Sequence, residues 1–273
     1  MIEPGPDGWQ AEYDVPGLHP DLDDYVERWG ADAAAFRRAS GGDLDVAYGS
    51  GGAKRIDFFT PSRPADAMVL FFHGGYWVEG SRKVYSHLAG GPLGNGLGVG
   101  IVGYDLAPKV ELAAIVAQAK AAVVFTANRF PLPIVVAGHS AGGHLAVMAV
   151  ADEAVPTRHA VTVSGIFDLE PLLELPLNRL LGLDAPAATS LSPINLDPPP
   201  GVTLRLAVGE DETAAFHDQS RSMAQRWSTA GAQAEYLAVP GRHHLSVIEE
   251  LADPGGMLAG LCRAAADDAL RAG

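Results

Sequence analysis

The segment Gly138-His139-Ser140-Ala141-Gly142 places a serine between two glycines, after an apolar run and before a helical one. In a G-x-S-x-G turn between a strand and a helix, the serine stands at the tip with its hydroxyl exposed. Glycines two residues before and after the serine are needed because side chains there would collide. The amide of Ala141 would then point from a helix N-terminus toward a developing oxyanion. The motif predicts nucleophilic catalysis by Ser140.

A second motif, His73-Gly74-Gly75-Tyr76-Trp77, directly follows the apolar run 68–72. An H-G-G turn at this place supplies backbone N–H groups to an oxyanion hole, opposite the donor that follows the serine. We expect Gly74 and Gly75 to provide these donors. We expect His73 to hold the loop in place rather than to carry protons.

A nucleophilic serine needs a base within reach, and the base needs an acid that sets its tautomer. In this architecture the chain order is nucleophile, acid, base. Of the nine histidines, His243 and His244 are those that follow the last expected strand. We prefer His244 because it opens the apolar run 245–248, which would anchor it. His243 would then be solvated or would line the pocket.

The acid should follow the strand expected at 203–208, where the chain reads Gly209-Glu210-Asp211-Glu212. Aspartate and glutamate both serve in this role, and at least one of these carboxylates should face the base. Spacing alone leaves Asp211 and Glu212 open as candidates.

These residues need a scaffold, and the apolar runs predict it. The expected strands are 68–72, 98–104, 133–138, 159–165, 203–208 and 235–239, and the expected helices are 111–128, 141–152, 214–231 and 256–271. Fully apolar strands that alternate with helices are typical of a parallel sheet covered on both faces. We therefore predict a single α/β domain over 1–273, with a mostly parallel central sheet, helices on both faces and an edge hairpin at 43–49 and 54–60. Ligands of such sheets bind at the carboxyl ends of the strands.

Two segments lie outside this alternation. Residues 1–40 are polar and acidic, carry aromatics such as Trp9 and Trp29, and include a helix expected around 21–39. This N-terminal segment either caps the site or packs on the sheet. Residues 170–201 are rich in leucine and proline. They contain too many leucines for a solvated linker, so we expect a lid-like excursion over the site.

Composition narrows the function classes. The chain has 273 residues, of which 48% are hydrophobic, and a formal net charge of −14. Such a charge repels nucleic acid and anionic membrane surfaces. The lone Cys262, an N-terminus without a secretory pattern and the absence of an apolar run of roughly 18 residues favour the cytoplasm. No zinc-protease, P-loop or dinucleotide motif is present. We therefore expect a small-molecule acyl substrate and neither metal nor cofactor, and a homodimer stays open.

Taken together, the motifs resemble those of the kynurenine formamidase (arylformamidase) group of α/β-hydrolases and of its esterase relatives. The matching stretches run in the same order from about residue 21 to 251: HGGYW at 73–77, YDLAP at 104–108, GHSAGGHLA at 138–146, SGIFDLEPL at 164–172, Ser192-Pro193, VGEDETAAFHDQS at 208–220 and HHLSVIEEL at 243–251. The resemblance implies an α/β-hydrolase fold. It implies Ser140 as nucleophile, His244 as base and Glu212 as acid, at a position where many relatives carry aspartate. The oxyanion donors it implies are Gly74, Gly75 and Ala141.

The activity that this resemblance implies is removal of a small acyl group, such as formyl, from an aryl amide. We expect Tyr76, Trp77 and Phe167, with the leucines of 172–182, to line the aromatic side of the site. A carboxylesterase that cleaves small aryl or alkyl esters with the same triad is the main alternative. A pathway-specific hydrolase of another aryl-acyl compound and a catalytically inactive binding protein on this fold are the others.

Overall fold

The computed structural model describes residues 8–272 and contains an eight-stranded sheet in the order β1-β2-β4-β3-β5-β6-β7-β8. The strands are β1 (Asp43–Ala47), β2 (Arg55–Phe59), β3 (Met68–Phe72), β4 (Gly98–Val102), β5 (Ile134–His139), β6 (His159–Val163), β7 (Thr203–Gly209) and β8 (Gln233–Val239). β1 and β2 form an antiparallel hairpin at one edge, and β2 also pairs antiparallel with β4. The remaining pairings are parallel. The predicted α/β fold with a mostly parallel sheet is confirmed.

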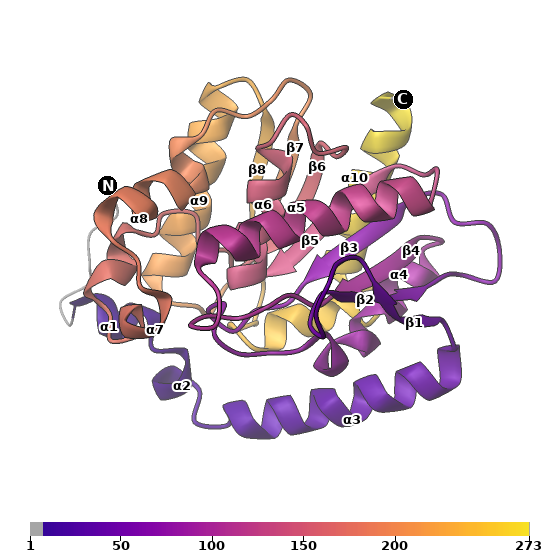
Figure 1. Ribbon diagram of the computed structural model, residues 1–273, viewed down its shortest axis with the longest axis horizontal. Coiled ribbons are helices and arrows are strands. Elements are labelled where there is room, and N and C mark those ends of the chain that lie inside the picture. Colours follow the sequence, from indigo (N-terminus) through magenta and orange to yellow (C-terminus); the bar gives the residue numbers. More distant parts are fainter. Residues whose placement is uncertain (1–7, 273) are drawn as a thin grey trace.

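Long helices cover both faces of this sheet (Figure 1). They are α5 (Leu112–Arg129), α6 (Ala141–Val150), α9 (Ala214–Thr229) and α10 (Met257–Ala272). α5 lies in front of the sheet in Figure 1 and contacts α6, whereas α10 lies behind it and contacts β5 and β6. α9 packs against β7 and β8. The strands β3, β4, β5 and β6 are buried at every residue because helices cover both of their faces.

The register of the parallel strands brings the two sequence motifs together. Phe72, at the end of β3, pairs with Gly138 near the end of β5. The loop that begins at His73 and the turn that contains Ser140 therefore leave the sheet side by side, at its carboxyl edge. In the last two strands of the sheet order, Gly209 at the end of β7 pairs with Val239 at the end of β8. The loops after these two strands carry the candidate acid and base to the same edge.

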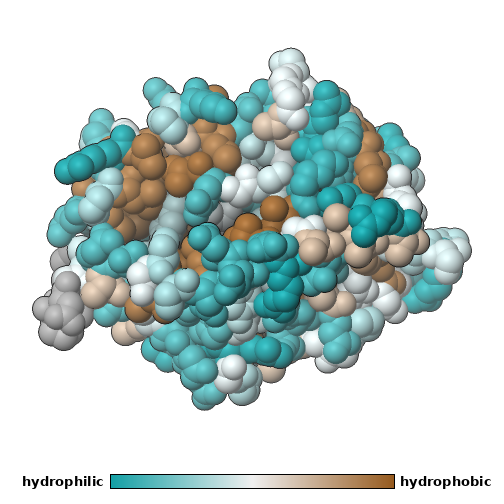
Figure 2. Space-filling model, turned by 90° about the horizontal axis from the view of Figure 1, so that it is seen from below, coloured by the Kyte–Doolittle hydropathy of each residue, from teal (hydrophilic) through white to brown (hydrophobic). Residues whose placement is uncertain are grey.

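The N-terminal segment forms α1 (Gly8–Tyr13), α2 (Val15–Leu18) and α3 (Leu22–Ser40). α3 lies below the sheet in Figure 1 and contacts the short helices η1 (Arg82–Val84) and η2 (Ser86–Ala89), which follow the His73 loop. Figure 2, seen from the α3 side, shows a mostly hydrophilic surface interrupted by separate hydrophobic patches. The small helix α4 (Gly90–Gly94) joins η2 to β4.

The excursion at 170–201 consists of short helices rather than irregular chain. They are η3 (Glu170–Glu174), α7 (Asn178–Leu181), α8 (Ala185–Leu191) and η4 (Pro193–Asn195). The side chains of Leu172, Leu175, Leu181 and Leu183 are buried. This burial explains the leucine content of the segment. A last short helix, η5 (Ser246–Leu251), follows the histidine pair. Within residues 8–272, no helix combines the length and apolarity that crossing a membrane requires.

Candidate active site

Ser140 lies at the tip of a strained turn between β5 and α6. Its φ of 53° is in the left-handed region, which side chains other than glycine rarely adopt. A Cβ at Gly142 would collide with the backbone oxygens of Phe72 and His73, so this position requires glycine. The amide of Ser140 donates to the carbonyl of Val163 at 2.8 Å. These constraints hold the serine at the mouth of the turn, and the following residue, Ala141, begins α6.

His244 and Glu212 form a buried pair beside this turn. Nδ1 of His244 lies 2.7 Å from Oε2 of Glu212, and both side chains are almost fully shielded from solvent. The other carboxylate oxygen accepts hydrogen bonds from the amide of Gly209 at 2.7 Å and from the hydroxyl of Ser164 at 2.5 Å. Because Nδ1 faces the carboxylate, Nε2 is the nitrogen that remains for the serine. His244 and Ser140 line the same cavity.

The structure separates the two pairs of neighbouring candidates that sequence had left open. Glu212 contacts His244, whereas Asp211 is exposed. His243 turns toward the N-terminal segment: its ring stacks on that of His19 at 4.7 Å, and its Nε2 lies 3.3 Å from the hydroxyl of Tyr25. His243 therefore serves the contact between this loop and the N-terminal segment.

His139, the residue before the serine, supports the base. Its Nε2 donates to the backbone carbonyl of His244 at 2.9 Å, and the two rings lie 4.7 Å apart. Burial, and secondarily the nearby His244, lower the pKa of His139 well below its usual value. A neutral His139 can donate this hydrogen bond without adding a positive charge beside the base. His139 and Ser164 were not predicted to contribute to the site. Their position within the motifs at 138–146 and 164–172 was the one sequence signal that pointed to them.

The loop after β3 approaches Ser140 closely. A Cβ at Gly74 would lie 3.0 Å from Nδ1 of His139 and 3.3 Å from Cβ of Ser140, a tighter contact than most Cβ atoms make, so glycine favours this approach. His73 does hold the loop: its Nδ1 lies 2.7 Å from the carbonyl of Gly74, and its ring stacks on that of Tyr104 at 4.3 Å. Burial lowers the pKa of His73 to about 4, which leaves it neutral at physiological pH.

The N-terminal helix α1 joins the two loops that carry the candidate site. The hydroxyl of Tyr76, in the loop after β3, donates to the carbonyl of Tyr13 at 2.6 Å. Next to Tyr13, the side chain of Glu12 accepts a hydrogen bond at 3.0 Å from the amide of Ala215, in the first turn of α9. Its backbone carbonyl accepts a bond at 2.8 Å from the hydroxyl of Thr213, which directly follows the candidate acid. α1 thus fixes the loop after β3, the candidate oxyanion loop, relative to the loop after β7, which carries the candidate acid Glu212.

A cavity of about 220 Å³ opens at Ser140. Its walls come from the catalytic loops, the N-terminal segment and the chain after the oxyanion loop. The lining residues are Val15, Pro16, Leu22, Asp23, Val26, Trp29, Gly74, Gly75, Tyr76, Glu79, Gly80, Val84, Tyr85, His139, Ser140, His244 and Leu245. No residue of 170–201 is among them. The N-terminal segment therefore forms the wall that the excursion was expected to provide.

Of the predicted substrate contacts, Tyr76 lines the cavity and Trp77 and Phe167 do not. Trp77 and Phe167 are fully buried in the core. The Trp77 ring packs edge-on against that of His144 at 5.0 Å, and the amide of Phe167 donates to Oε1 of Gln219 at 2.8 Å. A role for Trp77 or Phe167 in direct substrate contact does not fit these positions. Their size and apolarity instead serve the packing beneath the site.

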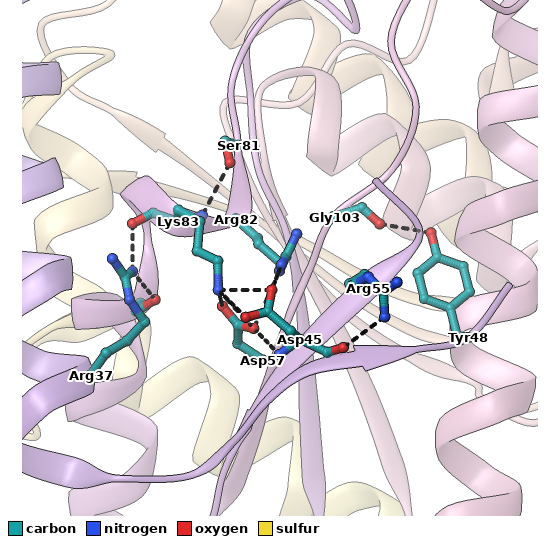
Figure 3. Close-up of polar contacts among 10 residues, drawn as sticks. Arg37, Asp45, Tyr48, Arg55, Asp57, Ser81, Arg82, Lys83 and Gly103 are labelled. Carbon is teal, nitrogen blue, oxygen red and sulfur yellow. Dashed lines mark hydrogen bonds and ion pairs between the residues drawn. The ribbon is translucent and has the colours of Figure 1, made fainter. Parts of the chain in front are cut away.

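An ion-pair network fixes the outer wall of the cavity (Figure 3). Asp57 on β2 is fully buried, and its carboxylate contacts Nε of Arg82 at 3.3 Å and Nζ of Lys83 at 3.2 Å. Asp45 on β1 pairs with the same two basic side chains. Arg82 and Lys83 belong to η1, which ends at the lining residue Val84 and is followed by Tyr85, also in the lining. The network thus ties this wall to the edge hairpin.

In the part of the chain that the structure describes, no group of three or more His, Cys, Asp or Glu side chains is arranged to hold a metal ion. The arrangement around Ser140 can instead support nucleophilic acyl transfer. It brings together a serine hydroxyl at a strained turn, a histidine paired with a buried carboxylate, and a glycine loop close to the serine.

The chain is similar to known proteins in sequence. A family model for the alpha/beta hydrolase fold matches residues 69–181. Kynurenine formamidase from Danio rerio is 30% identical over 230 residues, which cover 79% of this chain and 78% of that protein. The same enzyme from Salmo salar is 30% identical, over 77% of each chain.

Solved structures also resemble this chain. A proposed thioesterase from a Silicibacter species is similar with a TM-score of 0.87 and 34% identity, covering 92% of this chain and 97% of that one. A thermostable carboxylesterase cloned from a metagenomic library has a TM-score of 0.70 at 21% identity, covering 90% of this chain and 97% of its own. This second likeness concerns the fold alone.

Proposed function

The chain belongs to the alpha/beta hydrolase family, among the relatives of kynurenine formamidase, and we propose that it removes a formyl group from an aryl amide. The protein is a hydrolase of arylformamidase or esterase type. We assign Ser140 as nucleophile, His244 as base and Glu212 as acid. The observation that carries this assignment is the buried 2.7 Å contact between Nδ1 of His244 and Glu212 at the cavity that Ser140 lines.

In the first half of the proposed reaction, Nε2 of His244 takes the hydroxyl proton of Ser140 while Oγ bonds to the formyl carbon. The ionised Glu212 stabilises the imidazolium that results. The amides of Gly74, Gly75 and Ala141 are the proposed donors to the oxyanion, and each such donor contributes roughly 10²–10³ in rate. When the tetrahedral intermediate collapses, the C–N bond breaks and His244 passes its proton to the departing aryl amine.

In the second half, His244 takes a proton from water as the water oxygen attacks the formyl ester of Ser140. Collapse of this intermediate releases formic acid, and the proton held by His244 returns to Ser140. Atoms and charges balance without a cofactor. The close approach of Gly74 to Ser140 leaves little room on the acyl side, which supports a small acyl group. Trp29, Tyr76 and Tyr85 offer aromatic surface for the leaving group.

The second candidate is a carboxylesterase, which the likeness to solved carboxylesterases and to a proposed thioesterase favours. The same machinery cleaves both bonds. A comparison within one bond type therefore discriminates better than a comparison of an amide with an activated ester.

The test measures kcat/KM for formanilide, acetanilide and phenyl acetate, with Ser140→Ala as the control. We expect kcat/KM for formanilide to exceed that for acetanilide by roughly 10–200-fold, because one added methyl group in a tight pocket costs about that much. Rapid cleavage of phenyl acetate with no cleavage of formanilide would replace the formamidase proposal with an esterase. Ser140→Ala should lose activity by about 10⁶. A wild-type Ser140 that a fluorophosphonate fails to label would indicate an inactive binding protein.

We also propose a reducing compartment, the cytoplasm. Cys262 is the one cysteine of the chain, and it is free and buried. Burial raises the pKa of its thiol to about 12, which keeps it unreactive and consistent with a packing role.

A further inference from the structure

The lining of the cavity at Ser140 has an uneven charge. Asp23 from α3 and Glu79 from the chain after the oxyanion loop both line it, and no lysine or arginine does. The two histidines in the lining do not compensate. His139 is held neutral by the burial that lowers its pKa, and His244 faces the carboxylate of Glu212.

Three basic side chains on the neighbouring elements are paired with carboxylates. Arg28 of α3 contacts Glu249 at 2.7 Å and lies over the ring of Tyr25. Arg82 and Lys83 are held by the carboxylates of the edge hairpin (Figure 3). An anionic substrate group in the cavity would therefore meet carboxylates and no free cation.

The two cavity carboxylates themselves have no such partners. Among residues 8–272, neither Asp23 nor Glu79 takes part in an ion pair or a side-chain hydrogen bond. Both side chains are exposed. The remaining wall is apolar or aromatic and includes Leu22, Val26 and Trp29. Such a wall suits an aromatic leaving group, and the two carboxylates act on any charge that this group bears.

We infer that the cavity takes an aryl leaving group that is uncharged or cationic and rejects one that bears a carboxylate. This inference rests on the proposed acyl-transfer function. A cationic substituent gains attraction from Asp23 and Glu79, while a carboxylate is repelled and loses hydration without a counter-charge. Asp23 is the specificity-determining residue to test, because it lies on α3 and outside the catalytic loops.

The experiment uses formanilides that differ in one para substituent: aminomethyl (cationic), methyl (neutral) and carboxylate (anionic). The same substituents on phenyl acetate give a second series, so that charge selection can be measured whichever acyl bond is cleaved. For the wild-type enzyme at low salt, we expect kcat/KM of the cationic compound to exceed that of the anionic one by about tenfold or more, mainly through KM. The ratio should shrink at high salt because the two carboxylates are exposed to solvent.

Asp23→Asn should lower the cationic-to-anionic ratio several-fold, mainly through KM. Asp24→Asn is the matched control: it removes the same charge from the next residue of α3, which does not line the cavity. Equal kcat/KM for the cationic and anionic compounds in both series would overturn the inference. So would an equal effect of Asp23→Asn and Asp24→Asn. Inert formanilides with the charge order preserved on phenyl acetates would overturn the formamidase proposal alone.

Discussion

The N-terminal segment, residues 8–40, and the excursion at 170–201 both lie outside the alternation of strands and helices, yet they differ in what they do. The N-terminal segment supplies cavity residues from Val15 to Trp29. The excursion supplies none, and four of its leucines, Leu172, Leu175, Leu181 and Leu183, are buried in the core. Leucine content in such a segment therefore indicates burial and not a cover over the site.

The two segments are also attached differently. Polar contacts fasten the N-terminal segment to the catalytic loops, through Tyr13 and Glu12 and through Nε1 of Trp29, which donates to Glu249 at 3.1 Å. The excursion instead makes polar contacts with helices outside these loops: Nε2 of His144, in α6, lies 2.7 Å from the carbonyl of Leu191, and Nε1 of Trp227, in α9, donates to the carbonyl of Leu196 at 3.0 Å. From this difference we expect changes in the first segment to affect substrate recognition and changes in the second to affect stability.

The largest expected effect comes from a pair of truncations, one in each segment. Leu172→Ala removes a fully buried side chain from the excursion and should lower the free energy of unfolding by roughly 2–5 kcal/mol. KM of the folded enzyme should stay unchanged. Val26→Ala, on the exposed face of α3 that borders the cavity, should raise KM about threefold by removing apolar contact, with little loss of stability.

Urea unfolding and steady-state kinetics on the same preparations measure both effects. A raised KM in Leu172→Ala at temperatures where the enzyme is folded would contradict the division of roles. So would a large stability loss in Val26→Ala.

A smaller effect is expected from Tyr76→Phe. It removes the hydrogen bond by which the oxyanion loop is tied to the carbonyl of Tyr13. Stability should fall by about 1 kcal/mol, and kcat should fall several-fold because the oxyanion donors lose their fixed position.

Tyr48→Phe is the matched control, since the Tyr48 hydroxyl also donates to a backbone carbonyl, that of Gly103 at 2.7 Å (Figure 3). It should lose similar stability and keep kcat. If both variants lower kcat equally, the link through α1 does not position the loop.

The smallest expected effect is that the N-terminal segment loosens at a higher pH than the excursion at 170–201 does. The pKa of His19 is lowered by burial first and by His243 and His244 next, against the opposing effects of Asp21 and Glu212. Because the attached segment disfavours protonated His19, its attachment is strongest above the ordinary pKa near 6.5 and weakens as the pH falls below it. The N-terminal segment should therefore open more readily at pH 5.5 than at pH 7.5.

Hydrogen exchange, corrected for the intrinsic rate at each pH, should show lost protection in 15–30 before any loss in 170–201. The excursion is anchored on His144, whose pKa burial lowers to about 4, so its contact with Leu191 persists to lower pH. His19→Gln should remove the pH dependence of the N-terminal protection. Unchanged protection of the wild-type segment between pH 7.5 and 5.5 would refute the role of the histidine stack.

The fold and the centre of the candidate site could be predicted from local features of the sequence. Buried strands leave continuous apolar runs, and the tight turn at Gly142 requires glycine, so both features depend on local chain properties that a single sequence records. The order of the motifs along the chain then limited the acid to Asp211 or Glu212 and the base to His243 or His244.

Tertiary structure alone decided between neighbours. Glu212 rather than Asp211 meets His244, and Tyr76 rather than Trp77 meets the cavity. Adjacent residues of similar chemical type fit the same motif equally well. Which of them points into the site depends on the register of β7 against β8 and on the positive φ values of Tyr76 and Trp77. The N-terminal wall was likewise set by contacts between residues some two hundred positions apart, such as Glu12 with Ala215. Such contacts depend on how the whole chain packs, and no local pattern encodes them.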